Sequence, residues 1–287
     1  MADLQKNITG IIKETFSEWR QQKPELIGAA IAFYVIFSLG PILVITIRIV
    51  GIIFGEKAAE GQIVLQIQHI VGQQPAEIIE SIIELAYSPP SSYFVTIFSF
   101  PLVLIGATMI FFQIRNALHL IWGIEHSTEK GVIRLLKNYL FSFSLVIFMG
   151  IMVILLIVKS SSFAVLSELL SDFIPFHGYI LQILDMIMSF LIITLLFTMI
   201  YKLLPDLKIY WSDVIVGASV TTLLLSVAQI ILRLYIGHVD IGSAYGAIGS
   251  FTVLFVWVFY SSVVFLLGAV FTKVYAHKFG SFSNLMD

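Results

Sequence analysis

The sequence predicts an all-α membrane protein with six transmembrane helices and additional amphipathic helices at the membrane surfaces. Hydrophobic residues make up 59% of the 287 positions and charged residues only 12%. A soluble domain of this size has about a quarter of its residues charged. Several apolar runs also reach the about 20 residues that a helix needs to cross the hydrocarbon core of a bilayer. Composition and run length together therefore exclude a soluble globular domain.

Six apolar runs are long enough to be transmembrane helices. They cover residues 26–54, 93–121, 140–158, 179–200, 214–236 and 247–269. This pattern divides the chain into a surface segment at 1–25, a transmembrane domain at 26–270 and a tail at 271–287. Pro41 and Pro101 lie inside the first two runs. We expect each to kink its helix, because proline removes a backbone donor and clashes with the preceding turn.

The distribution of lysine and arginine predicts the orientation of these helices. Outside the predicted spans, eleven of these residues fall on the side that holds both termini. The opposite side holds only Lys57 and Lys159. Because positive loops stay in the cytoplasm, both termini are predicted to be cytoplasmic.

Two stretches outside the spans have amphipathic helical periodicity. In the first, the apolar residues are Leu4, Ile8, Ile11, Ile12, Phe16 and Trp19. This spacing predicts a helix on the inner leaflet. In the second, they are Ile63, Ile67 and Ile70, followed after Pro75 by Ile78, Ile79, Ile82 and Ile83. The second stretch either covers the outer mouth of a cavity or only packs against neighbouring spans.

Several functional classes receive no support from the sequence. The net charge is −2 without a basic block, so a nucleic-acid partner is not expected. There are no cysteines, which excludes disulfides and thiolate sites. The N-terminus has no cleavable signal-peptide pattern. No HExxH, GxSxG or P-loop motif occurs, so we expect neither an enzyme nor a metal or other cofactor.

Charged residues inside the apolar runs are the candidates for function, because a charge at mid-membrane costs at least ~3 kcal/mol. They are Arg48, Arg115, Asp185 and Arg233, with Gln229 one turn from Arg233. At ~1.5 Å rise per residue, Arg48 and Asp185 each lie ~10 Å from the outer ends of their helices. Arg233 is closer to the outer surface, whereas Arg115 is near the inner one.

Two interpretations of these charges remain open. Asp185 can simply neutralise Arg48 while Arg233 reaches the headgroups, a purely structural arrangement. Alternatively, the three residues form a polar cavity with excess positive charge that suits an anionic or zwitterionic headgroup. Likewise, Gly242, Gly246 and Gly249 indicate either close helix packing or a gating hinge at the start of the last span.

Four blocks in the sequence resemble the YihY/BrkB family of bacterial inner-membrane proteins, formerly called ribonuclease BN. The first runs from Ala29 to Pro41 and includes Tyr34 and Ser38. The others are Arg115-Asn116-Ala117 with Trp122, then Tyr201 to Pro205 with Trp211, Asp213 and Gly217, and finally Ser243 to Ala247 with Trp257, Tyr260 and Gly268-Ala269. The positions with an expected structural or gating role are Tyr34, Ser38, Pro41, Asn116, Pro205, Gly242, Tyr245 and Gly246.

The resemblance implies a six-helix protein of the bacterial plasma membrane. Many relatives carry a glutamate after the Gly-Ala pair, where this chain has Val270. The nuclease label has no support in these residues, because metal-dependent nucleases need clustered carboxylates or histidines. We expect an exporter or facilitator of a lipid-like or amphiphilic solute, with membrane lipids as its surroundings. The alternatives are a non-transporting scaffold for envelope biogenesis and, more remotely, a membrane-bound hydrolase.

Overall fold

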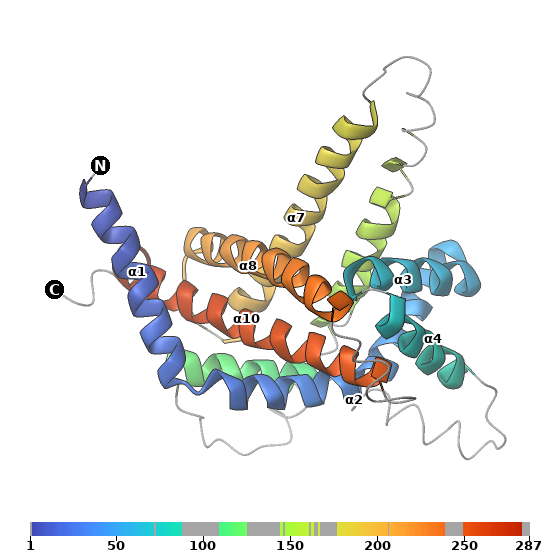
Figure 1. Ribbon diagram of the computed structural model, residues 1–287, viewed down its shortest axis with the longest axis horizontal. Helices are drawn as coiled ribbons and strands as arrows, with labels where there is room; N and C mark the ends of the chain where they lie inside the picture. The colour runs from blue at the N-terminus through green and yellow to red at the C-terminus, as the bar shows by residue number, and fades with distance from the viewer. Residues whose placement is uncertain are drawn as a thin grey trace.

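The computed structural model describes residues 2–71, 73–87, 109–124, 144–145, 147–160, 162–163, 166, 177–205, 207–238 and 249–282. All regular secondary structure within these ranges is helical (Figure 1). The named helices are α1 (Ala2–Gln21), α2 (Pro24–Phe54), α3 (Glu56–Val71), α4 (Gln73–Tyr87), α7 (His177–Leu203), α8 (Trp211–His238) and α10 (Gly249–Phe279). Two further helical segments cover 109–122 and Ile147–Ser160. The predicted all-helical class is confirmed for this part of the chain.

Among the described residues, three helices are long and apolar enough to cross a membrane, at Gly178–Leu203, Trp211–Leu232 and Phe251–Phe279. A fourth is obtained if Thr9–Gln21 and Pro24–Gly40 are counted as one span that bends by 69° at the break between them. The predicted spans at 93–121 and 140–158 lie partly outside the described residues. The number six therefore stays a prediction.

Helix α2 continues through Pro41, so this proline does not end the helix. The start of α2 is sharply defined, because Lys23 adopts the left-handed conformation with φ 49° and Pro24 follows at the first helical position. Proline suits this position, since the first turn of a helix has no intrahelical partner for the N–H that proline lacks. The turn at Lys23 separates α1 from α2. Pro101 lies outside the described residues.

Helices α2, α8 and α10 form a layer, and α7 and the Ile147–Ser160 helix project from it (Figure 1). A first apolar cluster joins this layer to α1 and the 109–122 segment, around Leu118, Tyr201, Val214 and Leu266. A second cluster joins α2 and α10 to α3, α4 and the Ile147–Ser160 helix, around Ile47, Ile63, Ile83 and Leu254. The core is thus divided along the length of α2 and α10.

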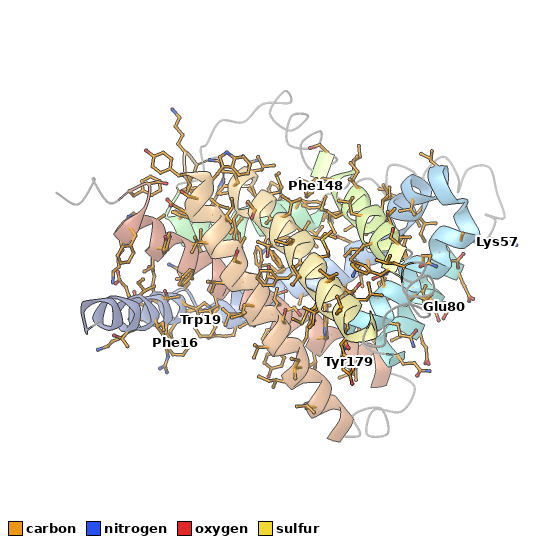
Figure 2. All side chains as sticks on the ribbon, turned by 90° about the horizontal axis from the view of Figure 1, so that it is seen from above. Phe16, Trp19, Lys57, Glu80, Phe148 and Tyr179 are labelled. Atoms are coloured by element: carbon orange, nitrogen blue, oxygen red, sulfur yellow. The ribbon has the colours of Figure 1, made fainter. Side chains whose placement is uncertain are left out.

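The amphipathic stretches predicted from the sequence are helices. In α3 and α4 the isoleucines Ile63, Ile79 and Ile83 are buried against α2. Helix α1 packs on α10 through Ile11, whereas Ile12 and Phe16 are exposed. Phe16 and Trp19 lie together at the end of α1 next to α2 (Figure 2). The predicted amphipathic helices are therefore confirmed, and the structure shows which neighbour each helix contacts.

Candidate functional site

A buried lysine is paired with a more exposed aspartate where α7 meets the Ile147–Ser160 helix. The Nζ atom of Lys159 lies 2.7 Å from Oδ1 of Asp185. The same ammonium group donates a hydrogen bond of 2.7 Å to the hydroxyl of Ser189. The lysine side chain is 7% exposed and the aspartate side chain 43%. The cation is therefore enclosed by protein, and its counterion faces outward.

A second polar contact extends this site to α3. The side-chain amide of Gln66 donates a hydrogen bond of 2.8 Å to the hydroxyl of Ser160, the residue after Lys159. We call Gln66, Lys159, Ser160, Asp185 and Ser189 the Lys159 cluster. Asp185 and Ser189 are four residues apart on α7, so they share one face of that helix. The cluster thus collects polar groups from three helices in an otherwise apolar region.

The electrostatics of the Lys159 cluster are those of a neutral ion pair with spare hydrogen-bonding groups. A lone charge in an apolar interior is expensive, so Lys159 requires an anion close to its ammonium group. Asp185 supplies that anion and Ser189 accepts a further N–H. An ammonium group fixed in this way can also donate to a carboxylate or phosphate oxygen that reaches the same position.

The structure gives Asp185 a partner that the sequence analysis did not consider. Lys159 was assigned to the outer side of the membrane without a role, because it falls just past a predicted span. The side chains of Arg48 and Arg233 lie outside the described residues. Their convergence with Asp185 therefore stays a prediction. Gln229, on α8, is half-buried.

The remaining predicted site residues are spread over the molecule. Arg115 and Asn116 are half-buried in the 109–122 segment, next to the first apolar cluster. Tyr34 is half-buried, while Ser38 and Pro205 are buried. Nothing is described for the side chain of Pro41. Gly242, Tyr245 and Gly246 lie outside the described residues, so the choice between packing and hinge stays open.

A second polar network lies between α7, α8 and α10. The hydroxyl of Tyr201 donates a 2.7 Å hydrogen bond to the carbonyl of Phe265 and lies 3.1 Å from Oγ1 of Thr221. About two turns earlier on α7, Thr194 donates to the hydroxyl of Thr222 over 3.1 Å. Tyr201 is 2% exposed, so its hydroxyl needs these partners. The network ties α7 to the other two helices at its C-terminal end.

Helices α8 and α10 touch through two reciprocal glycine–threonine contacts. A Cβ atom added at Gly217 of α8 would overlap Thr272 of α10, and one added at Gly268 of α10 would overlap Thr221 of α8. Each threonine hydroxyl donates to the carbonyl four residues earlier in its own helix, at 2.8 Å for Thr221 and 2.7 Å for Thr272. The interface is therefore close and leaves neither hydroxyl without a partner. A Gly-x-x-x-Thr repeat in both helices is the sequence signal for it.

The same two helices are also joined by a buried carboxylate, one turn before Gly217 on α8. Oδ2 of Asp213, in the first turn of α8, accepts hydrogen bonds from the backbone N–H and the hydroxyl of Ser281, at 2.7 and 2.5 Å. A Cβ atom at Gly280 would overlap this carboxylate. Nearby, the lysines Lys273 and Lys278 of α10 form ion pairs with Glu18 and Glu14 of α1.

These observations define an integral membrane protein of the helical class, in which polar contacts join several of the described helices. The model of the family described as Virulence factor BrkB matches residues 15–285, and the chain belongs to this family. The third and fourth blocks of the resemblance include Tyr201, Asp213, Gly217 and Gly268, and each of these residues takes part in one of the contacts described above.

Similar proteins carry the name UPF0761 membrane protein. One from Coxiella burnetii is 28% identical over 173 residues, which is 60% of each chain. One from Tolumonas auensis is 35% identical over 96 residues, 33% of this chain and 30% of that protein. One from Rhodospirillum centenum is 21% identical over 268 residues, 92% of this chain and 56% of that protein. The matches thus cover 60% or less of each relative's length. No solved structure matches.

Proposed function

We propose that this protein facilitates the movement of a lipid-like or amphiphilic molecule with an anionic headgroup across the bacterial plasma membrane. The observation that supports this proposal best is the buried ammonium group of Lys159 beside a half-exposed counterion. Exposed apolar side chains of α7 beside Asp185, which include Met186 and Met188, give an acyl chain a path alongside this charge. A headgroup would bind at Lys159 while its chains remain in lipid.

The proposal includes an orientation. We place both termini and the loop between α7 and α8 in the cytoplasm, which puts the Lys159 cluster in the outer part of the membrane. The lysine and arginine bias of the sequence supports this orientation. We also propose that the protein is not an enzyme, and in particular not a nuclease, because its sequence contains no hydrolase or metal-binding motif.

Reconstituted vesicles test the transport proposal directly. Purified protein is inserted into liposomes that contain a trace of phosphatidylglycerol with a fluorescent acyl chain. Dithionite, which does not cross the bilayer, then quenches only the fluorophores it can reach. We expect quenching to extend to inner-leaflet lipid with the wild-type protein and to stay limited to the outer leaflet with Lys159→Gln.

Two controls make this result specific. Lys57→Gln removes a lysine from the exposed start of α3, at the edge of the molecule (Figure 2), and should retain full activity. A fluorescent acyl chain attached to an uncharged headgroup should move more slowly than the anionic lipid. Equal movement in empty liposomes and in liposomes with wild-type protein would contradict the proposal.

A scaffold for envelope biogenesis is the second candidate. It is favoured by the close α8–α10 interface, since a rigid bundle suits a binding platform better than a moving carrier. A scaffold would not move lipid, so liposomes that contain the protein would show the same quenching as empty liposomes. It would instead co-purify with partner proteins, and the Lys159→Gln variant would bind these partners as well as the wild type does.

A further inference from the structure

We infer that the Lys159 cluster couples anion binding to the uptake of a proton by Asp185. The inference rests on the proposed headgroup site and assigns it an energy source. Its starting point is the unequal exposure of the two partners, 7% for the side chain of Lys159 and 43% for that of Asp185. The ammonium group is held in place, whereas the carboxylate can leave it by turning outward.

Charge balance determines what must happen when an anion arrives. Lys159 and Asp185 together are neutral. An added phosphate-type anion would leave one uncompensated negative charge in a region where such a charge is expensive. If Asp185 is protonated, the lysine and the ligand form the neutral pair instead. The favoured exchange therefore brings in one anion and one proton together.

The exchange involves the carboxylate of Asp185, the ammonium group of Lys159 and one oxygen of the ligand. Oδ1 of Asp185 takes a proton from a hydronium ion, which becomes water, and gives up its ionic contact with Nζ of Lys159. The ammonium group keeps all its protons and redirects one N–H from Asp185 to an oxygen of the ligand. Ser189 lies within hydrogen-bonding distance of the same ammonium group at 2.7 Å and stays bound during the exchange. No covalent bond other than the O–H of Asp185 is made.

Among the described side chains around Asp185, Lys159 is the charged group that is paired with the carboxylate. On α7 the residues one turn away are Leu181, Gln182, Met188 and Ser189, and none of them titrates. Helix α3 contributes Gln66, which is bound to Ser160. From α8, Gln229 is polar but uncharged. The side chains of Arg48, His69 and Arg233 lie outside the described residues.

Calorimetry on the full chain in detergent tests the coupling. Dioctanoyl phosphatidylglycerol is titrated in buffers of different ionisation enthalpy, from about pH 5 to about pH 8, so that the protons exchanged on binding are counted. The wild type should take up about one proton for each lipid bound at the upper end of this range. Its affinity should fall by at most about tenfold for each unit of rising pH.

Three variants separate coupling from a structural ion pair. Asp185→Asn should bind the lipid without proton uptake and without pH dependence, as tightly at high pH as the wild type does at low pH. Lys159→Gln should not bind it. The exchanged pair, Lys159→Asp with Asp185→Lys, retains the ion pair but places the cation outward, and should lose the proton uptake. The proton count of the wild type needs no variant, so it decides the question even if a variant fails to fold.

Glycerophosphoglycerol, the same headgroup without acyl chains, distinguishes an amphiphile from a free anion. Weaker binding of this compound with the same proton uptake supports the inference for an amphiphilic ligand. Equal binding supports the exchange but assigns it to a soluble phosphodiester. Lipid binding without proton uptake overturns the inference and leaves the headgroup site in place. If the wild type binds neither compound at any pH, the proposed function fails as well.

Discussion

Four residues, two glycines and two threonines, decide how closely α8 and α10 approach one another. Gly217 faces Thr272 and Gly268 faces Thr221, so each helix offers a gap and fills the gap of the other. Small residues permit this close packing in a membrane, where burial of apolar surface gives no advantage over lipid. The repeat can be found in the sequence, but the pairing between helices cannot, because it depends on which two helices are neighbours.

Gly268→Ala should destabilise the protein by about 1–3 kcal/mol, because its methyl group would overlap Thr221 in a packed interface. Thermal unfolding in detergent measures the loss. Gly61→Ala is the matched control, since a Cβ there has no neighbour within 4 Å and alanine is the better helix former. Adding Thr221→Gly to Gly268→Ala should restore part of the stability. Equal stabilities for the two alanine variants would refute this account of the interface.

Asp213→Ala should cost more than Ser281→Ala, because the carboxylate accepts both the backbone N–H and the hydroxyl of Ser281. A hydrogen bond to a charged group contributes about 1.5–3 kcal/mol. In a double-mutant cycle in detergent, the double variant should therefore lose less stability than the sum of the losses of the two single variants.

Ser219→Ala serves as the control for this cycle, since that hydroxyl bonds only to a carbonyl of its own helix, at 2.8 Å. Strict additivity of Asp213→Ala and Ser281→Ala would show that the hydrogen bond between the two side chains contributes nothing. The sequence marks Asp213 only as part of a resemblance block. Its partner lies 68 residues later and can be identified only from the fold.

At the scale of elements, hydrophobic periodicity predicted helices α1, α3 and α4 but not the surfaces they contact. Helix α1 carries apolar residues on more than one side, and the structure divides them between α10, through Ile11, and the exterior, through Ile12 and Phe16. The ion pairs of α1 with Lys273 and Lys278 could not be predicted either. They join helices at opposite ends of the chain.

Lys273→Glu should loosen α1 from α10, because it places two negative charges together at Glu18. Thr15, which is 5% exposed, reports this when it is replaced by cysteine in this cysteine-free chain. Its labelling by a maleimide should become roughly twofold to fivefold faster, since partly exposed ion pairs contribute less than about 1 kcal/mol. Restoring the pair with Glu18→Lys should slow the labelling again. Unchanged rates in all three proteins would exclude an electrostatic contribution to the docking of α1.

At the scale of the whole molecule, composition and run length predicted the class correctly, because the bilayer imposes length and polarity on every span. The structure finds three spans of sufficient length in the described residues, or four with the bent pair. The site is a different matter. A charge inside a span marks Asp185 as a candidate, but a lysine at the end of a span carries no such signal, so only the contact with Asp185 identifies Lys159.

The proposed orientation predicts which positions are accessible from outside the cell. Lys208, in the loop between α7 and α8, and Lys57, at the start of α3, are both exposed. Either can be replaced by cysteine, which is then the only cysteine in the chain. An impermeant maleimide added to intact cells should label Lys57→Cys and not Lys208→Cys. Both should react after the cells are permeabilised. Labelling of Lys208→Cys in intact cells would show that the protein has the opposite orientation to the one proposed.

The anchoring of α7 at one end has a mechanical consequence. Its C-terminal end is held by Tyr201 through Phe265 of α10, while the large side chains of its other end, such as Tyr179 and Ile183, are exposed. The glycine–threonine contacts leave the α8–α10 pair no room to slide, so under the proposed function this pair would be the fixed part of the molecule. Any tilt of α7 about Tyr201 would be limited at its other end by the hydrogen bond between Lys159 and Ser189. The movement that opens the ion pair would therefore be confined to the carboxylate of Asp185 and would leave the helix in place.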